Sequence, residues 1–304
     1  MANYYHYEPS KSAAAAFSVL FGITTAVHLY QLLRTRTWFW IAFLVGGIFA
    51  DEVAPIVETF GFGARVINAK EAQEGDGDMT FAVVVVSNIG IILAPILFAA
   101  SVYMTLGRIV LLSGQSDLSL VRPRWLTKLF VLGDVIAFLV QAYGVSQLTS
   151  DDPDTIDKGR IVMVVGLWIQ IAFFTFFIIT ALLFWTRMSR VSPKSSKATP
   201  WKKHLLVLLT ASLLILMRCL YRVIEYMQGP DGEIISTESY VYIFDAAPMF
   251  IMMLVFHYYH PSEVGALLYG GKMICLFRVE TFEKRPEAEL VGFVRTASRD
   301  HGEA

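Results

Sequence analysis

The sequence has few of the features that stabilise small secreted domains or bind nucleic acid. Only two of its 304 residues are cysteines, Cys219 and Cys275, and only 17% are charged. Two cysteines cannot form a disulfide framework, and a net charge of -1 at pH 7 gives no basic surface for nucleic acid. There is also no Asn-x-Ser/Thr glycosylation acceptor. We therefore expect neither a disulfide-rich scaffold nor a nucleic-acid partner.

The sequence also lacks a phosphate-binding loop for ATP. Gly270-Gly271-Lys272 has neither the spacing nor the Ser or Thr of that motif. ATP hydrolysis is therefore not encoded in this chain, and any transport would be facilitated or proton-coupled.

What the sequence has in excess is apolar residues. They make up 55% of the chain, and the mean hydropathy is +0.54, whereas soluble domains are roughly 45–50% apolar. A membrane-spanning helix needs about 20 predominantly apolar residues. Seven runs qualify, at 12–33, 38–60, 80–110, 126–148, 160–186, 203–227 and 239–260. We predict an all-α polytopic membrane protein, a seven-transmembrane-helix bundle over residues 1–261 with a flexible cytoplasmic tail over 262–304.

Basic residues are distributed unevenly around these runs. Eighteen lie in or beside the connections after the first, third and fifth runs and in the tail, whereas five lie on the opposite side. Positive residues accumulate on the cytoplasmic side of membrane proteins. We therefore expect the N-terminus outside and the C-terminus in the cytoplasm. The expected location is the plasma membrane, with a vacuolar or other internal membrane as the alternative.

The sixth run ends in a charged stripe. Arg218, Arg222 and Glu225 lie within roughly 60° of one another on a helix. Each charge would cost on the order of 3 kcal/mol in lipid, so we expect the stripe to face the bundle interior. A structural ion-pair network and a ligand-binding role are both compatible with this pattern.

Depth along the helices predicts partners for the two arginines. Asp245 in the seventh run lies level with Arg222, and we predict that these two residues pair. Asp51 in the second run lies level with Arg218. We expect Arg218 to reach Asp51 or its neighbour Glu52.

Most polar residues inside the runs fall in the outer half of the bundle. We predict that they line an outward cavity for the polar head of a substrate. The substrate-binding candidates are Glu58, Asn88, Asp134, Gln141, Gln170, Arg218, Arg222, Glu225 and Asp245. For Asp134, Gln141 and Gln170, hydrogen bonding between helices is the alternative.

The acids in this half outnumber the two arginines. Some of them must therefore be protonated, exposed to water or reserved for a cationic group of a ligand. Glu58, Glu225 and Asp245 are expected to meet a cationic head group. Asp51, Glu58 and Asp245 are also candidate proton carriers.

Three histidines, His28, His257 and His260, are expected at similar depth toward the cytoplasm. Their spacing is compatible with a zinc site or an axial haem ligand. No intramembrane carboxylate lies at that depth to complete a zinc site, and a lone histidine often caps a helix end. We therefore expect no metal and no cofactor, and keep haem ligation as an alternative.

Small residues at i, i+4 spacing predict close helix packing. The pairs are Gly90 with Ala94 and Gly133 with Ala137. Such spacing lets the backbones of neighbouring helices approach each other.

Short motifs follow one another along the runs. They are Glu58-Thr-Phe-Gly61-Phe62-Gly-Ala-Arg65, Leu93-Ala94-Pro95, Arg122-Pro123-Arg124, Gly133-Asp134 with Gln141, Gly166-Leu167 with Gln170, Tyr221-Arg222 with Glu225-Tyr226, and Phe244-Asp245 with His260-Pro261. In these motifs the chain resembles the fungal RTA-like family of seven-helix membrane proteins, also called lipid-translocating exporters. It departs from the family at Ser87-Asn88, where Gln is common, and at 142–145, where a glycine cluster is common. Both departures lie in the outer half, so the substrate does not carry over.

The resemblance implies movement of amphiphiles. Family members are associated with efflux or flipping of sphingoid long-chain bases, resistance to toxic amphiphiles, and porphyrin or haem movement. We therefore expect an exporter- or flippase-like transporter, not driven by ATP, whose partners are an amphiphilic lipid substrate and the bilayer. We expect no enzyme activity. The alternatives are a seven-helix receptor or sensor and a porphyrin- or haem-binding membrane protein. Against a receptor, Leu106-Gly107-Arg108 ends the third run in place of Asp/Glu-Arg-Tyr.

Overall fold

The structure, a computed structural model, describes most of the helical part of the chain. It describes residues 11–53, 78–148, 150, 152–190, 201–229, 232, 238–268, 273–275 and 278–279. Side chains are described for residues 17, 19–48, 92–148, 150, 152–190, 201–229, 232 and 239–268.

Seven helical segments in the described residues coincide with the seven predicted spans. They are α1 (Lys11–Thr35), α2 (Ile41–Val53) with the preceding 3-10 turn η1 (Trp38–Trp40), α4 (Asp78–Leu112), α5 (Pro123–Leu148), α6 (Pro153–Arg190), α8 (Trp201–Gln228), and the composite of α10 (Glu238–Val241), η3 (Tyr242–Ala246) and α11 (Ala247–Tyr258). Five of the helical stretches are long and apolar enough to cross a membrane. The prediction of an all-α polytopic membrane protein is confirmed.

Shorter elements complete the described fold. They are η2 (Ser116–Leu118), α12 (Ser262–Leu268) and a small antiparallel pair, β1 (Met273–Cys275) with β2 (Arg278–Val279). The strand pair was not expected from the sequence. It lies beyond the bundle, so it does not change the helical architecture.

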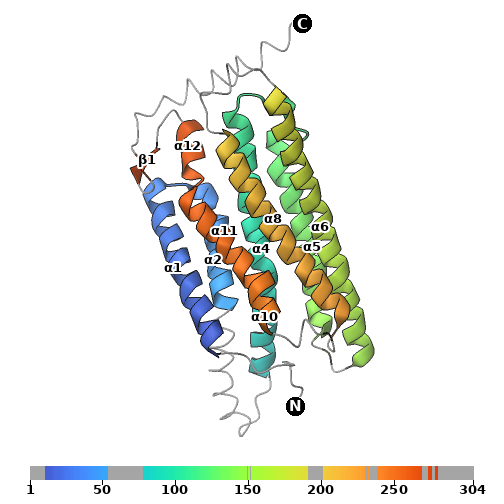
Figure 1. Ribbon diagram of the computed structural model, residues 1–304. Coiled ribbons are helices and arrows are strands. Elements are labelled where there is room, and N and C mark those ends of the chain that lie inside the picture. The colour runs from blue at the N-terminus through green and yellow to red at the C-terminus, as the bar shows by residue number, and fades with distance from the viewer. Residues whose placement is uncertain are drawn as a thin grey trace.

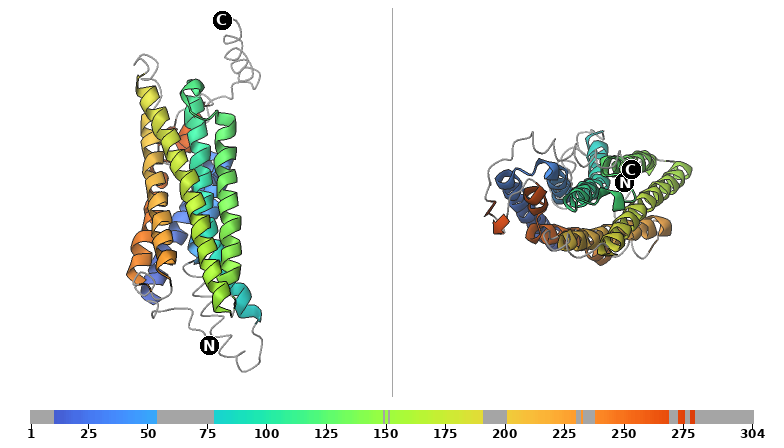
Figure 2. Two further views of the ribbon diagram at one scale, coloured as in Figure 1. Left: turned by 90° about the vertical axis from the view of Figure 1, so that its right-hand side faces the viewer. Right: turned by 90° about the horizontal axis from the view of Figure 1, so that it is seen from above.

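The helices follow sequence order around a closed ring (Figure 2). Each helix contacts the next one, from α1 through α2, α4, α5, α6 and α8 to α11, and α11 returns to contact α1. α4 also contacts α8 across the ring. Polar side chains on α4, α5, α6 and α8 can therefore meet in one place inside the bundle.

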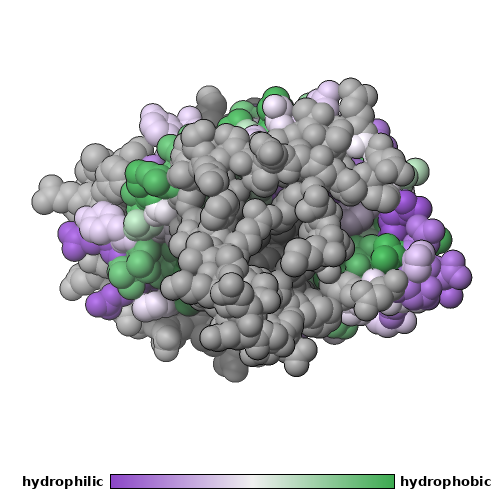
Figure 3. Space-filling model, turned by 90° about the horizontal axis from the view of Figure 1, so that it is seen from below, coloured by the Kyte–Doolittle hydropathy of each residue, from purple (hydrophilic) through white to green (hydrophobic). Residues whose placement is uncertain are grey.

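Proline begins both helices of the α5–α6 hairpin, and a side-chain hydrogen bond lies beside the start of α6. α5 and α6 both begin at a proline, whose missing N–H is not needed in the first helical turn. The hydroxyl of Thr155 donates a 2.7 Å hydrogen bond to the exposed Asp152. This bond lowers the pKa of the Asp152 carboxyl. Asp152, Asp154 and Lys158 are exposed. Seen from below, the described hydrophilic residues lie at the left and right edges of the molecule (Figure 3).

Small residues bring α5 and α6 close together. A Cβ atom on Gly133 would lie 2.4 Å from the ring of Phe173. A Cβ atom on Gly144 would lie 3.0 Å from the carbonyl oxygen of Gly159 on the facing helix. The predicted close packing at Gly133 is confirmed, whereas the Gly90 position lies outside the described side chains.

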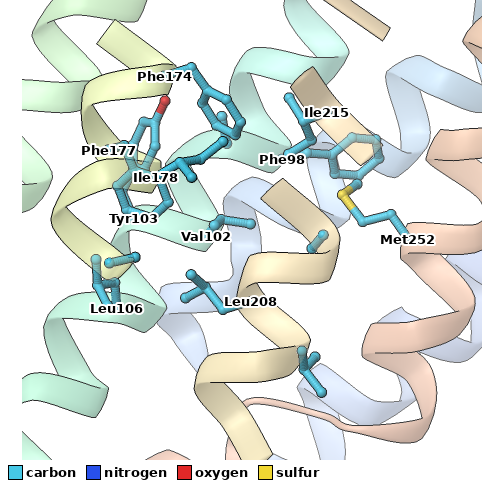
Figure 4. Packing of buried hydrophobic residues seen from close by; sticks show 14 of the residues in the cluster. Phe98, Val102, Tyr103, Leu106, Phe174, Phe177, Ile178, Leu208, Ile215 and Met252 are labelled. Carbon is cyan, nitrogen blue, oxygen red and sulfur yellow. The ribbon is translucent and has the colours of Figure 1, made fainter. Parts of the chain in front are cut away.

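Aromatic residues fill the centre of the bundle. Tyr103 of α4 packs against Phe174 and Phe177 of α6, with ring centroids 5.9 Å and 4.6 Å apart (Figure 4). Large apolar side chains also cover the outside, since Leu139 of α5 and Ile161 of α6 are each 61% exposed. An apolar exterior around a packed interior is what a lipid-embedded bundle requires.

The start of α1 and the short helix α12 lie at opposite ends of the bundle (Figure 1). This agrees with an odd number of spans, but the side of the membrane on which each end lies stays a prediction. The expected tail begins with α12, whose Val264 is fully buried, and Glu263 lies 3.0 Å from Lys203 of α8. The helical part therefore extends to Leu268, and most of the tail beyond the β1–β2 pair lies outside the described residues.

Candidate functional site

An ion-pair cluster joins α8 to the start of the last span. Arg218 contacts one carboxylate oxygen of Asp245 through its Nε atom, and Arg222 contacts the other oxygen through Nη2. Arg222 also donates from Nη1 to Glu225, 2.9 Å away and one turn further along α8. The four side chains are between 9% and 15% exposed. Two positive and two negative charges therefore compensate each other inside the bundle.

The predicted pairing of Arg222 with Asp245 is confirmed. The prediction missed that Asp245 also binds Arg218. A carboxylate has two oxygens, and Arg218 and Arg222 are one helical turn apart, so Asp245 can bridge them. The expected contact of Arg218 with Asp51 or Glu52 lies outside the described side chains and stays a prediction.

The local backbone around Asp245 is unusual. Asp245 lies in the π-helical segment η3, which is followed by Pro248 near the start of α11. Proline has no N–H to bond to the carbonyl four residues before it, and a wider turn relieves that mismatch. Single π-helical turns are frequent at functional sites. Here the turn carries the acid that both arginines share.

A pocket lies beside the ion-pair cluster, between four helices. It is lined by Ile92 and Pro95 of α4, Gln141 of α5, Met163, Leu167 and Gln170 of α6, and Arg218, Cys219, Arg222 and Tyr226 of α8. Its cavity volume is about 30 Å³, enough for one or a few water molecules. In this conformation a ligand larger than a few water molecules fits only if the helices around the pocket move apart.

Two glutamines connect the helices on one wall of this pocket. The Gln141 side-chain amide donates a 3.0 Å hydrogen bond to the side-chain oxygen of Gln170. Gln141 lies on α5 and Gln170 on α6, so this hydrogen bond links the two helices. Both side chains are buried. The alternative of helix-to-helix hydrogen bonding is therefore confirmed for these two residues, although both also face the pocket.

The structure brings most of the predicted site together. Gln141, Gln170, Arg218 and Arg222 line the pocket, while Glu225 and Asp245 bind the arginines. Asp134 is buried in α5 but does not line the pocket. The side chains of Glu58 and Asn88 lie outside the described part of the chain.

Besides four apolar lining residues, two pocket residues with a polar group were not among the sequence candidates. Cys219 and Tyr226 both line the pocket beside the arginines. Cys219, Arg222 and Tyr226 are spaced at i, i+3 and i+7, which places them on one face of α8. That periodicity was visible in the sequence, but neither residue carries a charge that draws attention to it.

The three histidines gather at the other end of the bundle. The ring of His28 lies 5.5 Å from that of His257 and 6.3 Å from that of His260, so the expected similar depth is confirmed. His28 Nε2 lies 3.1 Å from the carbonyl oxygen of Met253 and must donate to it, which makes its Nδ1 an acceptor.

The hydrogen bond of His260 fixes the opposite tautomer. Its Nδ1 accepts from the backbone N–H of Ser262, so its Nε2 carries the proton. A metal ligand needs an unprotonated ring nitrogen, and His28 and His260 do not both offer one to a shared ion. Within the described residues, no group of three His, Cys, Asp or Glu side chains is arranged to hold a metal. The geometry gives a shared zinc site of these histidines no support, and haem ligation by a single histidine stays an alternative.

The chain is similar to several fungal membrane proteins. The family model described as "RTA1 like protein" matches residues 53–266. Protein RTA1 of Saccharomyces cerevisiae is 33% identical over 273 residues, 83% of each chain. Protoporphyrin uptake protein 1 of the same species is 30% identical over 294 residues, 83% of this chain and 90% of that protein.

A more distant relative is named for a lipid. Sphingoid long-chain base transporter RSB1 of Saccharomyces cerevisiae is 25% identical over 284 residues, 80% of this chain and 69% of that protein. No solved structure matches the chain. The matched span includes α4, α5, α6, α8 and α11, and therefore the whole ion-pair cluster and pocket. The chain belongs to the RTA1-like family of membrane proteins.

Proposed function

We propose that this protein moves an amphiphilic lipid, such as a sphingoid long-chain base, across a membrane without using ATP. It acts as an exporter- or flippase-like transporter and not as an enzyme. In the proposed setting, the plasma membrane, this activity contributes to resistance against toxic amphiphiles. The observation that carries the proposal is the buried cluster of Arg218, Arg222, Glu225 and Asp245 beside a pocket in a bundle with an apolar exterior.

In this proposal a charged head group binds to the cluster by replacing one member of an existing ion pair. Each acid is already bound to an arginine, so a cationic amine must replace a guanidinium group as the partner of a carboxylate. Glu225 is the better candidate, because its described ionic partner is Arg222 alone, whereas Asp245 has two. Arg222 would keep Asp245 when Glu225 turns to the amine. The exchange keeps every buried charge paired, which avoids a large desolvation cost.

The apolar part of the substrate would contact the apolar side of the pocket and the lipid-facing surface of the bundle. Ile92, Met163 and Leu167 form the apolar side of the pocket. The outer surface of α5 and α6 carries large exposed apolar side chains that suit acyl chains. A head group inside the bundle and a tail toward lipid is the arrangement expected for a translocated amphiphile.

A porphyrin is the second candidate substrate. One relative is named Protoporphyrin uptake protein 1. Arg218 and Arg222 both line the pocket, and two guanidinium groups suit a ligand that carries two carboxylates. In that case the ligand would replace Asp245 as the partner of the arginines.

The proposal is tested with purified protein in lipid vesicles. A fluorescent sphingoid base, a fluorescent phospholipid and protoporphyrin are each followed across the bilayer, without ATP, against protein-free vesicles. We expect faster movement of the sphingoid base than of the other two compounds. Faster movement of the porphyrin alone would favour the second candidate. Equal rates with and without protein for all three would contradict both.

A further inference from the structure

Asp134 of α5 is a buried acid that the ion-pair cluster does not use. Its side chain is 1% exposed, and neither carboxyl oxygen makes a hydrogen bond of ordinary geometry to the described residues. Asp245 is similarly buried, but two guanidinium groups contact it. The surroundings of Asp245 therefore stabilise a negative charge, and those of Asp134 do not.

Two titratable side chains face Asp134 from neighbouring helices. Tyr103 of α4 interacts with the carboxyl, although its buried hydroxyl makes no well-formed hydrogen bond within the described structure. The buried thiol of Cys219, on α8, lies within electrostatic range of the same carboxyl. α6 contributes Phe174 and Phe177, which pack against Tyr103 (Figure 4). None of these groups supplies a positive charge.

The physical consequence concerns the protonation state of Asp134. An ionised carboxylate without a cationic partner is one of the most costly groups to bury. Ionisable residues inside membrane spans are rare, and they often mark ion or proton pathways. We propose that Asp134 is a proton-binding site, at which the carboxylate takes up one proton when the bundle is closed and releases it when the bundle opens to water.

Asp134 is placed to link this proton to the pocket. Gln141 lies two turns further along the same face of α5 and lines the pocket. Cys219 also lines the pocket and is near the Asp134 carboxyl. When the helices around the pocket separate to admit a head group, water gains access to Asp134. This coupling rests on the proposed function: the protonated form favours the closed bundle and the ionised form favours the open bundle.

This assignment differs from the proton carriers expected from the sequence. Asp245 was one of them, but Arg218 and Arg222 both bind it and favour its ionised form. Asp51 and Glu58, the other two, lie outside the described side chains. Among the buried acids with described side chains, Asp134 is the one that lacks a cationic partner.

Infrared difference spectroscopy tests the proton site without any transport measurement. Wild-type protein, Asp134→Asn and Tyr103→Phe are compared in lipid nanodiscs near neutral pH. We expect a carbonyl band of a protonated carboxyl group in the wild type, its loss in Asp134→Asn, and its retention at a shifted frequency in Tyr103→Phe. Asparagine resembles the neutral acid in shape, so thermal unfolding should show the Asp134→Asn protein to be about as stable as the wild type. An unchanged band in Asp134→Asn, or no such band in the wild type, would overturn the proposal.

A second measurement tests the coupling. Vesicles that contain wild-type or Asp134→Asn protein are given a proton gradient, and movement of the fluorescent sphingoid base is followed with and without an ionophore that collapses it. We expect the gradient to change the wild-type rate and to have no effect on Asp134→Asn. An unaltered gradient effect in the variant would overturn the coupling. If the wild type moves no lipid at all, the proposed function fails, and the infrared result still decides whether Asp134 binds a proton.

Discussion

Arg222 and Asp245 form an ion pair although 23 residues separate them in the sequence. The pair ties α8 to the π-helical turn at the start of the last span. Because Asp245 also contacts Arg218, and Arg222 also contacts Glu225, the four residues act as one network. Removal of a single member should therefore have different effects at different positions.

Asp245→Asn should be strongly destabilising. It removes the carboxylate that Arg218 and Arg222 both contact. Removal of one partner from a buried pair typically costs about 3–5 kcal/mol. Denaturant unfolding in detergent measures the loss. In a double-mutant cycle with Arg222→Gln, the coupling should be about 0.5–3 kcal/mol. Additive effects of the two substitutions would show that the pair does not interact.

Glu225→Gln should lower the transport rate with a smaller loss of stability than Asp245→Asn. Arg222 keeps Asp245 in this variant, so folding should be affected less than by Asp245→Asn. The exchange of partners proposed for a cationic head group needs the Glu225 charge. We expect a lower rate of sphingoid-base movement at normal protein levels, with Gln228→Glu as a control that adds an acid one turn away. Full activity of Glu225→Gln would make Glu225 a purely structural residue.

Gly144→Ala should weaken the α5–α6 hairpin. The added methyl group would lie 2.7 Å from the side chain of Met163 and 3.0 Å from the backbone oxygen of Gly159. Overpacking of this kind costs about 1–3 kcal/mol. The matched control is Gly107→Ala in α4, where the nearest atom is 3.8 Å away. Thermal unfolding should show a loss for the first variant and none for the control. Equal stability of the two variants would contradict the described contact.

The orientation is still a prediction from the distribution of basic residues. A tag after Ala304 should be reached only from the cytoplasmic side, and a tag inserted near Asp76 only from outside. Protease protection in sealed membranes makes this measurement. The reverse pattern would invert the depth assigned to every polar residue.

The seven spans and the Arg222–Asp245 pair were predictable because both depend on simple periodicity and depth. A run of about 20 apolar residues defines a span, and a position along a helix defines a level in the bilayer. The double role of Asp245 was not predictable, because it depends on the π-helical turn that sets its direction. The roles of Cys219 and Tyr226 depend on which face of α8 meets α4 and α6, and only the packing of the ring determines that.

The proposed transport requires the pocket beside the arginines to open. Cys219 lines the pocket and is 2% exposed, so its thiol reports on opening. The measurement is the alkylation rate of Cys219 by a membrane-permeant reagent in Cys275→Ser protein, with and without sphingoid base, and with Cys219→Ser as the unreactive control. We predict that the base accelerates alkylation and that the alkylated protein no longer moves the base. An alkylation rate that does not respond to the base, together with full transport by the alkylated protein, would contradict the claim.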